Sequence, residues 1–419
     1  MKNAIHMGDD GPESPGPRDV LLLHISNFYA VIEAFGVLAY QSIQTQLRDR
    51  LQKLPGLGPD WLQAGPDVFL ELREGWSQLA SLGAERYCRL VAATLSDAPI
   101  LHENRAVLLR LEVWLTSDGA APPSLRDAMH FDLTSADTEA RDRRAQRYRH
   151  DMAAASALVA RLRAGDLVFA FQPVVGLSGE RDVLYWESLL RAPGDHEPLG
   201  QGSCEGGIVA LERLGMVDRL DFGVIDSLLG VLQRHPGITL GCNVSAQSLY
   251  PCLWWRSLLG LLQDQPAVAS RLVIEVTETS AISQDEAALA LLSSLRRAGC
   301  RIALDDMGAG YSTLDFAVRA EPDFVKVDKA YLHPSLAGTR HTPQLLRKFV
   351  QLCAELAPHV ILEGVETRQD QALAAEVGAG GLQGHLFGIP QTLPPWAVTE
   401  QQVRAPAPWP QARRTAGGP

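Results

Sequence analysis

The chain has 419 residues, of which 46% are hydrophobic and 21% charged, and its formal net charge at pH 7 is −11. This composition is typical of a globular protein, and the negative charge argues against non-specific nucleic-acid binding, which needs a basic surface. A chain of this length usually forms more than one hydrophobic core, so two domains are expected.

Both ends of the sequence are polar and rich in Gly, Pro or Ala, so disorder is expected over residues 1–17 and 403–419. The start lacks the apolar segment of a signal peptide, and no apolar run approaches the roughly 20 residues that span a bilayer. The six cysteines are scattered without a CxxC pair, which indicates reduced thiols. A cytoplasmic protein without a transmembrane segment is therefore expected.

The first part of the chain predicts a small α/β domain over residues 18–145. Apolar runs typical of short strands occupy 20–23, 67–72 and 106–115, and helical spacing of apolar residues covers 28–54 and about 75–97. Residues 135–150 are rich in Arg and Asp, and 152–163 again show helical spacing. These two stretches predict a connecting helix, with the linker placed at 146–164.

From residue 165 to 402 the sequence repeats a short apolar strand, a loop and, in most cases, a helix. Strand candidates lie at 168–175, 182–189, 238–243, 271–276, 301–305, 323–327, 359–363 and 380–386. Eight units of this size predict a (β/α)8 TIM-like barrel. The expected fold class is therefore α/β, with a C-terminal barrel preceded by a smaller α/β domain.

Polar and charged residues lie at or near the carboxyl ends of these predicted strands, where the catalytic groups of such barrels gather. They are Glu187, Asn243, Glu275, Asp305, Asp306, Lys326, Glu363 and Gln383. Any one of the acids alone is more often a helix cap or a solvated loop residue. Five carboxylates on successive strands are different, because burying them without cations would cost several kcal/mol for each charge.

The simplest account of these carboxylates is a site for hard divalent metal ions. Asp, Glu and Asn oxygens suit Mg²⁺ or Mn²⁺, and the absence of His and Cys from the set argues against zinc. The adjacent pair Asp305 and Asp306 could let one carboxylate bridge two ions. Two ions about 3.5–4 Å apart are the usual arrangement for phosphodiester hydrolysis by an activated hydroxide.

Eight ordered motifs then give the barrel a family resemblance. They are FQPVV at 171–175, ESLLR at 187–191, NVSAQSL at 243–249, EVTE at 275–278, DDMGAGYSTL at 305–314, KVD at 326–328, EGVET at 363–367 and QGH at 383–385. In kind and order they resemble the EAL phosphodiesterases, which hydrolyse cyclic di-GMP to linear pGpG with two Mg²⁺ or Mn²⁺ ions. The resemblance also implies a homodimer formed through the EAL domain.

The resemblance assigns a role to each matching residue. One ion would be held by Glu187, Asn243, Glu275 and Asp305, and the second by Asp305 and Asp306 with help from Glu363. Catalytic roles fall to Lys326, Glu363 and Glu278, of which Glu278 would hold the loop 306–314. Substrate contacts fall to Gln172, Arg191 and Gln383.

Four positions depart from the family pattern, namely Ser188, Met307, Ala309 and His385. Ser188 is small and is expected to point away from the ligands. None of the four removes a metal ligand, so an active enzyme is expected, although Met307 and Ala309 could loosen the loop that Glu278 holds.

The first domain resembles a degenerate GGDEF (diguanylate cyclase) domain. His24 stands where that family has a metal-binding Asp, and Ile32-Glu33 stands where Asn-Asp would recognise guanine. The signature itself becomes Gly65-Pro66-Asp67-Val68-Phe69, in which Val68 replaces an acid. This domain is therefore expected to make no cyclic di-GMP. It is either a regulatory module, with a protein partner or GTP, or a structural remnant.

Two other functions remain open from the sequence. The barrel could be a receptor that binds cyclic di-GMP without cleaving it, although receptors usually lack the metal ligands present here. It could also be an interaction module that binds no nucleotide.

Overall fold

The computed structural model describes residues 20–54, 57–72, 84–96, 98–116, 138–179, 182–192, 204–277, 285–308, 314–333, 342–394 and 396. The chain divides into two compact units, Met1–His150 and Asp151–Pro419. Within the described ranges, no helix combines the length and the apolar character needed to cross a membrane.

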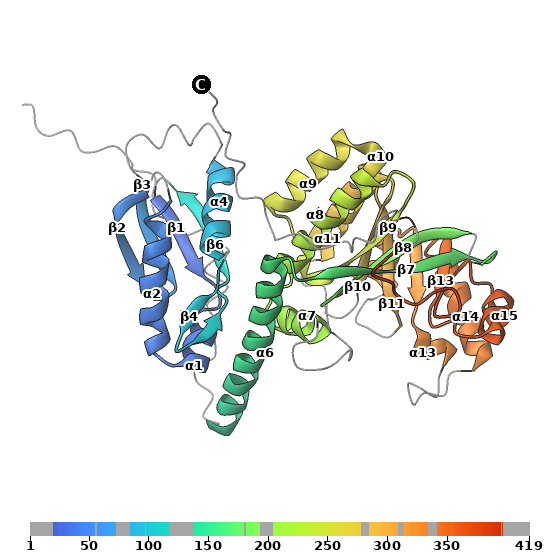
Figure 1. The fold of residues 1–419 in the computed structure, drawn as a ribbon, viewed down its shortest axis with the longest axis horizontal. Coiled ribbons are helices and arrows are strands. Elements are labelled where there is room, and N and C mark those ends of the chain that lie inside the picture. The colour runs from blue at the N-terminus through green and yellow to red at the C-terminus, as the bar shows by residue number, and fades with distance from the viewer. Residues whose placement is uncertain are drawn as a thin grey trace, which may run out of the picture. The chain divides into compact units, whose positions relative to one another are not determined.

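The first unit is built on an antiparallel sheet with the strand order β2-β3-β1-β6 (Figure 1). Its strands are β1 (Val20–Ile25), β2 (Leu57–Ala64), β3 (Asp67–Leu72), the hairpin β4 (Ile100–His102) and β5 (Arg105–Val107), and β6 (Leu111–Thr116). Its helices are α1 (Phe28–Phe35), α2 (Leu38–Leu51) and α4 (Ala84–Ser96). The α/β class predicted for this part of the chain is confirmed.

Two local predictions for this unit were wrong, and one strand was missed. The expected helix over 28–54 is two helices, because Gly36 adopts a φ of +86° that an α-helix cannot contain. The expected strand 106–115 is split between β5 and β6. Strand β2 was not predicted, since its Gly58 and Pro59 are residues typical of turns.

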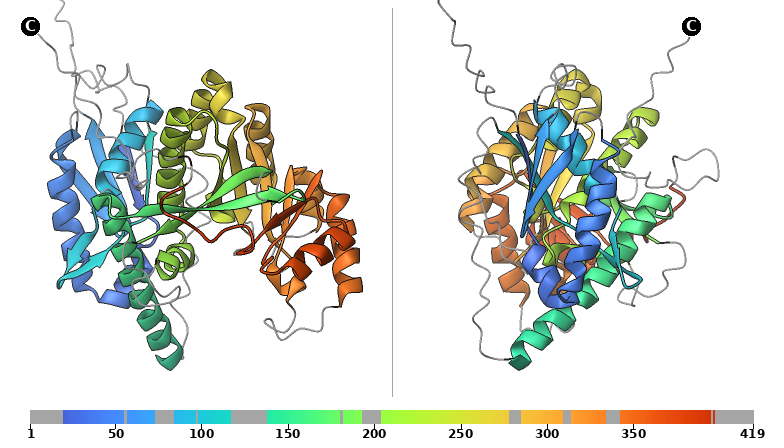
Figure 2. Two further views of the ribbon diagram at one scale, coloured as in Figure 1. Left: turned by 45° about the vertical axis from the view of Figure 1, so that its right-hand side comes forward. Right: turned by 90° about the vertical axis from the view of Figure 1, so that its left-hand side faces the viewer.

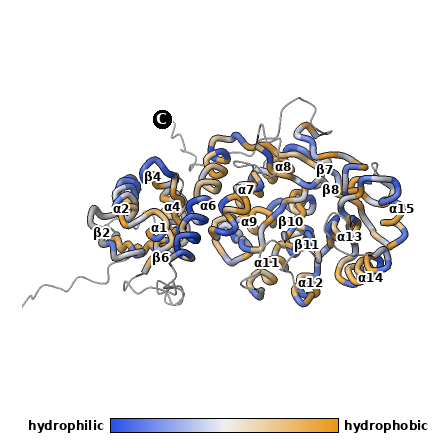
Figure 3. Tube along the Cα trace, turned by 90° about the horizontal axis from the view of Figure 1, so that it is seen from below, coloured by the Kyte–Doolittle hydropathy of each residue, from blue (hydrophilic) through white to orange (hydrophobic). Residues whose placement is uncertain are grey.

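A single helix, α6 (Thr138–Ala164), covers the described part of both stretches that predicted a connecting helix. Its residues change from hydrophilic in the first half to largely apolar in the second (Figure 3). The apolar half buries side chains at helical spacing, namely Met152, Ala155, Leu158, Val159 and Leu162. This half therefore belongs to the core of the second unit.

The second unit is a closed barrel of eight strands, as predicted from the sequence. The strands are β7 (Val168–Gly176), β8 (Val183–Arg191), β9 (Leu240–Ser245), β10 (Leu272–Thr277), β11 (Arg301–Met307), β12 (Phe324–Val327), β13 (His359–Leu362) and β14 (Gly381–Gln383). The helices around them are α7 (Cys204–Arg213), α8 (Asp218–Arg234), the 3-10 turn η1 (Ala246–Ser248), α9 (Leu253–Asp264), α10 (Pro266–Ala269), α11 (Asp285–Arg297), α12 (Leu314–Ala320), α13 (Lys329–Leu332), α14 (Pro343–Ala354) and α15 (Arg368–Val377).

The barrel departs from a regular (β/α)8 fold at β7, which is antiparallel to both of its neighbours, β8 and β14. A short turn joins β7 to β8, so no crossover helix covers the outside of this hairpin. The segment that follows β14, residues 384–394, runs beside this hairpin instead (Figure 2). Gln391 pairs with Phe171 through backbone hydrogen bonds of 2.9 and 3.0 Å, and the Trp396 ring packs 5.1 Å from that of Phe171.

The interior of the barrel has two layers of side chains that explain the position of the charged residues. The lower layer is apolar and contains Val174, Tyr185, Val273, Ala303, Phe324 and Ile361. Side chains two residues apart on a strand share a face. Two residues from each member of this layer, towards one mouth of the barrel, stand Gln172, Glu187, Glu275, Asp305, Lys326 and Glu363.

Candidate active site

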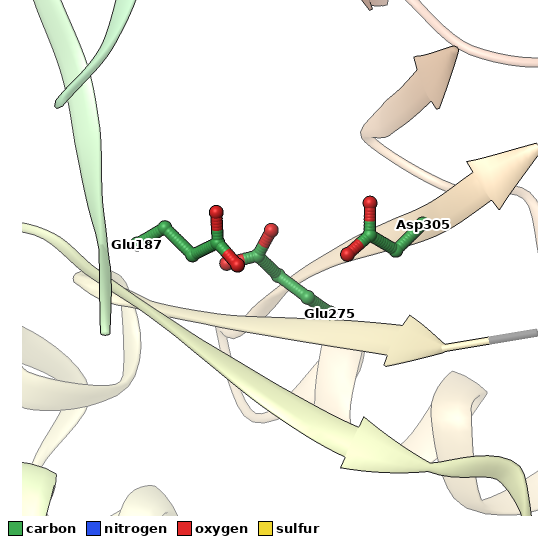
Figure 4. Close-up of side chains that lie close together, drawn as sticks. All are labelled: Glu187, Glu275 and Asp305. Atoms are coloured by element: carbon green, nitrogen blue, oxygen red, sulfur yellow. The ribbon is translucent and has the colours of Figure 1, made fainter. Parts of the chain in front are cut away.

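The centre of the site is the ammonium group of Lys326, whose side chain is buried in β12. Its Nζ lies 2.9 Å from Glu363 Oε1, 3.0 Å from Glu275 Oε2, 3.0 Å from Asp305 Oδ1 and 3.5 Å from Glu187 Oε2. Figure 4 shows that Glu187, Glu275 and Asp305 point toward one another from three different strands. The structure thus brings together four of the carboxylates predicted at strand ends, although Glu187 lies in the middle of β8 and not at its end.

The fifth carboxylate, Asp306, joins the group because β11 is irregular. Neighbouring residues of a regular strand point to opposite faces. Here the pairing register shifts between Leu304 and Met307, and Asp306 adopts a φ of +52°. Carboxylate oxygens of Asp305, Asp306 and Glu363 consequently lie within 4.8 Å of one another.

Amide side chains surround the carboxylate of Glu187. Asn243 Nδ2 donates to its Oε1 at 2.8 Å, and Gln383 Nε2 donates to its Oε2. The same Gln383 amide lies 3.2 Å from Gln172 Oε1, and Gln172 Nε2 donates to the Gly388 carbonyl oxygen at 3.1 Å. Both glutamines are buried, so in this structure they form part of the support of Glu187.

Two other predicted site residues remain, of which the structure describes Arg191 but not Glu278. Arg191 ends β8, and its Nη1 donates to the carbonyl oxygen of Leu190 at 2.9 Å, a contact outside the carboxylate group. Glu278 lies outside the described residues, as do Ala309 and the rest of the loop up to residue 313. Of the other family departures, Ser188 is buried on the face of β8 opposite Glu187, and His385 is exposed.

Burial and mutual repulsion perturb the titration of these acids. Burial raises the pKa of Glu275 to about 8 and that of Asp306 to about 6, and it also raises the pKa of Asp305 and Glu363. Burial acts the same way on Glu187, but Lys326 and the amide donors outweigh it and lower its pKa. The surrounding carboxylates overcome the burial of Lys326 and raise its pKa, so the ammonium stays protonated.

The donor set fits divalent cations. Two groups, each with oxygens within 4.8 Å of one another, are formed by Glu187, Glu275 and Asp305 and by Asp305, Asp306 and Glu363. Oε1 of Glu275 and Oδ1 of Asn243 are buried and find no hydrogen-bond partner among the described residues. Five carboxylates beside one ammonium leave four negative charges, which two divalent cations would balance.

Sequence reasoning missed two residues beneath this group, Tyr185 and Gly241. The Tyr185 hydroxyl donates to Glu275 Oε2 at 3.1 Å. Gly241 stands where a side chain would collide with Glu275. Strand alternation places both on the inner face, two residues before Glu187 and Asn243, but the sequence gives no sign of the contacts that they make.

In the first unit, the positions compared with a cyclase carry structural contacts. His24 Nδ1 lies 2.7 Å from Asp67 Oδ1, and Val68 is fully buried. The Pro66 carbonyl oxygen accepts a hydrogen bond from the backbone N–H of Ile25, and Glu33 pairs with Arg141 at 3.2 Å. The contacts of His24 and Ile25 join β1 to the start of β3, and the Glu33–Arg141 pair joins α1 to the first half of α6.

The EAL domain model matches residues 155–390, which is more than half of the chain. Among curated relatives, "Probable cyclic di-GMP phosphodiesterase PdeA" of Escherichia coli (strain K12) is 28% identical over 55% of this chain and 31% of its own. "Cyclic di-GMP phosphodiesterase NbdA" of Pseudomonas aeruginosa is 28% identical over 58% of this chain and 31% of its own. The chain thus spans about a third of the length of these two relatives.

Among solved structures, PaMucR phosphodiesterase in complex with c-di-GMP aligns with a TM-score of 0.46 and 27% identity, over 54% of this chain and 97% of that one. The family match begins inside α6 and includes every strand of the barrel. It contains all the carboxylates described above. This chain therefore belongs to the EAL domain family.

Proposed function

We propose that the barrel hydrolyses cyclic di-GMP to linear pGpG and requires two divalent cations, Mg²⁺ or Mn²⁺. The observation that carries the proposal is the group of four carboxylates within 3.5 Å of the Lys326 ammonium. A buried group of this kind has little stabilising value by itself. Membership of the EAL family and the names of the relatives supply the substrate.

The two carboxylate groups would hold the two ions. Glu187, Asn243, Glu275 and Asp305 form the first set of ligands, and Asp305, Asp306 and Glu363 form the second. When bound, the ions would supply a nucleophile at neutral pH and offset the negative charge of the phosphate.

Other side chains of the barrel would stabilise the developing charge and contact the substrate. Lys326, whose pKa the surrounding carboxylates raise, can stabilise negative charge as it develops on the phosphate, since it is buried where water screens little. Gln383 donates to Glu187 and Gln172 lies beside Gln383, and both are also proposed to contact the substrate. Arg191, at the end of β8, is proposed to meet a substrate phosphate.

The first unit is proposed to regulate the barrel without cyclase activity. The position of the cyclase's metal-binding Asp holds His24, which bonds Asp67. The position of the signature's acid holds Val68, which lies in the core. Neither position offers the carboxylate that a cyclase needs.

Product analysis of the full-length protein with cyclic di-GMP and Mg²⁺ or Mn²⁺ tests the proposed activity. Wild type should release pGpG, and Glu187→Ala and Lys326→Ala should each lose ~100-fold or more of the rate. Glu205→Ala is the matched control, because it removes an exposed carboxylate on α7. Nucleotide binding without any product would instead identify a receptor, and the absence of binding would indicate an interaction module.

A further inference from the structure

Tyr185 lies directly below the carboxylates, in the apolar layer of the barrel interior. Its side chain is fully buried, and its ring packs 5.3 Å from that of Phe324. A phenol in such a place normally needs a hydrogen-bond partner. The partner is Glu275, whose Oε2 accepts the hydroxyl hydrogen at 3.1 Å.

Gly241, on the adjacent strand β9, makes this arrangement possible. A Cβ atom at this position would lie 2.0 Å from Glu275 Oε1 and 2.8 Å from Tyr185 Cε2. Any residue larger than glycine would therefore displace the carboxylate, the ring or both. Because Gly241 has no side chain, the Glu275 carboxylate and the Tyr185 ring can fill the space beside it.

The two oxygens of Glu275 are thus constrained from different sides. Oε2 contacts the Tyr185 hydroxyl and lies 3.0 Å from Lys326 Nζ, and Oε1 occupies the space beside Gly241. Oε1 is buried and has no hydrogen-bond partner among the described residues. A buried carboxylate oxygen of this kind is suited to ligate a divalent cation. Besides the Lys326 ammonium, two uncharged groups therefore set the orientation of the carboxylate from below, the Tyr185 hydroxyl and Gly241.

We infer that Tyr185 is a positioning residue, which acts with Gly241 to fix the carboxylate of Glu275 for a divalent cation. The inference rests on the metal site of the proposed function. Groups that orient a metal ligand typically change metal affinity 10–100-fold when they are removed. The Tyr185 hydroxyl is such a group, and the ring that carries it serves packing.

The test is a Mn²⁺ titration of the full-length protein without substrate, with free Mn²⁺ measured by electron paramagnetic resonance. Tyr185→Phe removes one oxygen and keeps the ring, and we expect ~10-fold weaker binding. Tyr250→Phe is the matched control, because its hydroxyl donates to Asp218 Oδ2 at 2.7 Å, outside the carboxylate group. It should change the affinity by less than about twofold.

A double-mutant cycle separates positioning from a general effect on the fold. If the hydroxyl acts through Glu275, Tyr185→Phe should cost almost nothing more in a protein that already carries Glu275→Gln. An undiminished loss in that background, or an unchanged affinity of Tyr185→Phe alone, would overturn the inference. Gly241→Ala provides a second variant, and it should weaken binding at least as much, since its methyl group meets Glu275 Oε1.

The wild-type titration distinguishes failure of the inference from failure of the proposed function. Wild type that binds no Mn²⁺ would overturn the metal site and the inference with it. Wild type and Tyr185→Phe that bind Mn²⁺ equally would overturn the inference alone.

Discussion

Lys326 and the carboxylates around it carry opposite charges, and all of these charged groups are largely buried inside the barrel. Each group alone would be costly inside the barrel, and the ammonium can offset only part of the negative charge. The acids were predicted from their places at or near the carboxyl ends of predicted strands, because the loops at those ends of a barrel converge on one mouth. The distances to Lys326 and the support from Tyr185 depend on rotamers and on the missing side chain of Gly241, which sequence patterns do not reveal.

The raised pKa values predict how pH and metal ions affect stability. Without a cation, Glu275 keeps its proton up to about pH 8 and Asp306 up to about 6, whereas in the unfolded chain both lose it near 4. The folded state then binds more protons, so stability should fall as pH rises through this window. A divalent cation prefers the ionised carboxylates, so its stabilising effect should grow with pH.

Thermal unfolding with Mn²⁺ or with EDTA, at about pH 6 and about pH 8, measures this effect. Mn²⁺ should raise Tm more at the higher pH. Glu275→Gln should reduce the extra Tm increase at the higher pH, because the glutamine amide has no carboxyl proton that a cation could displace. A Tm increase of the same size at both pH values would contradict the linkage between metal binding and these acids.

At the scale of elements, irregular backbone in a strand brings side chains of the site together. The register shift in β11 and the positive φ of Asp306 turn two consecutive acids toward one place. The sequence showed the adjacent pair, but strand alternation alone would separate the two side chains, and a bulge leaves no reliable mark on a sequence. The antiparallel direction of β7 could have been predicted from the sequence, because too few residues separate β7 from β8 for a crossover helix.

Asp221 of α8 fixes the chain that follows β9. Its Oδ2 accepts hydrogen bonds from the Ser245 backbone N–H at 3.0 Å and from Ser248 Oγ at 2.6 Å. Burial raises the pKa of Asp221 to about 8, so the group is neutral at pH 7. An asparagine oxygen could accept both hydrogen bonds.

We therefore expect Asp221→Asn to cost less than about 1 kcal/mol of unfolding free energy and Asp221→Ala about 2–3 kcal/mol, since alanine leaves two buried donors unpaired. The excess unfolding free energy of wild type over Asp221→Asn should shrink as pH rises from about 4 to 8. In this range Asp221 loses its proton in the unfolded chain but keeps it in the folded one. Urea denaturation across this pH range measures both differences. Equal losses in the two variants would show that the hydrogen bonds do not matter.

At the scale of the whole molecule, the two units differ in how well sequence predicts them. Each of the eight barrel strands begins within two residues of its predicted start, although β14 ends at Gln383, before the predicted end at residue 386. In the first unit, β2 contains Gly58 and Pro59, and Gly36 interrupts an otherwise helical pattern. Gly58 and Pro59 lie where the pairing of β2 with β3 is irregular, so they interrupt the strand pattern of the sequence without ending the strand.

The contacts of the first unit predict that the full chain has no cyclase activity. A Glu187→Ala protein is the suitable sample, because its barrel should not consume the product. Incubation with GTP and Mg²⁺ should yield no cyclic di-GMP, since His24 and Val68 replace acids that a cyclase needs. Detectable synthesis by liquid chromatography would refute this account of the unit.

The most direct test of a paired-cation site is anomalous diffraction from crystals grown with Mn²⁺. Two anomalous peaks are expected about 3.5–4 Å apart, one beside Glu187, Asn243, Glu275 and Asp305 and the other beside Asp305, Asp306 and Glu363. Crystals that show no peak between these side chains, with Lys326 still in contact with all four carboxylates, would contradict it.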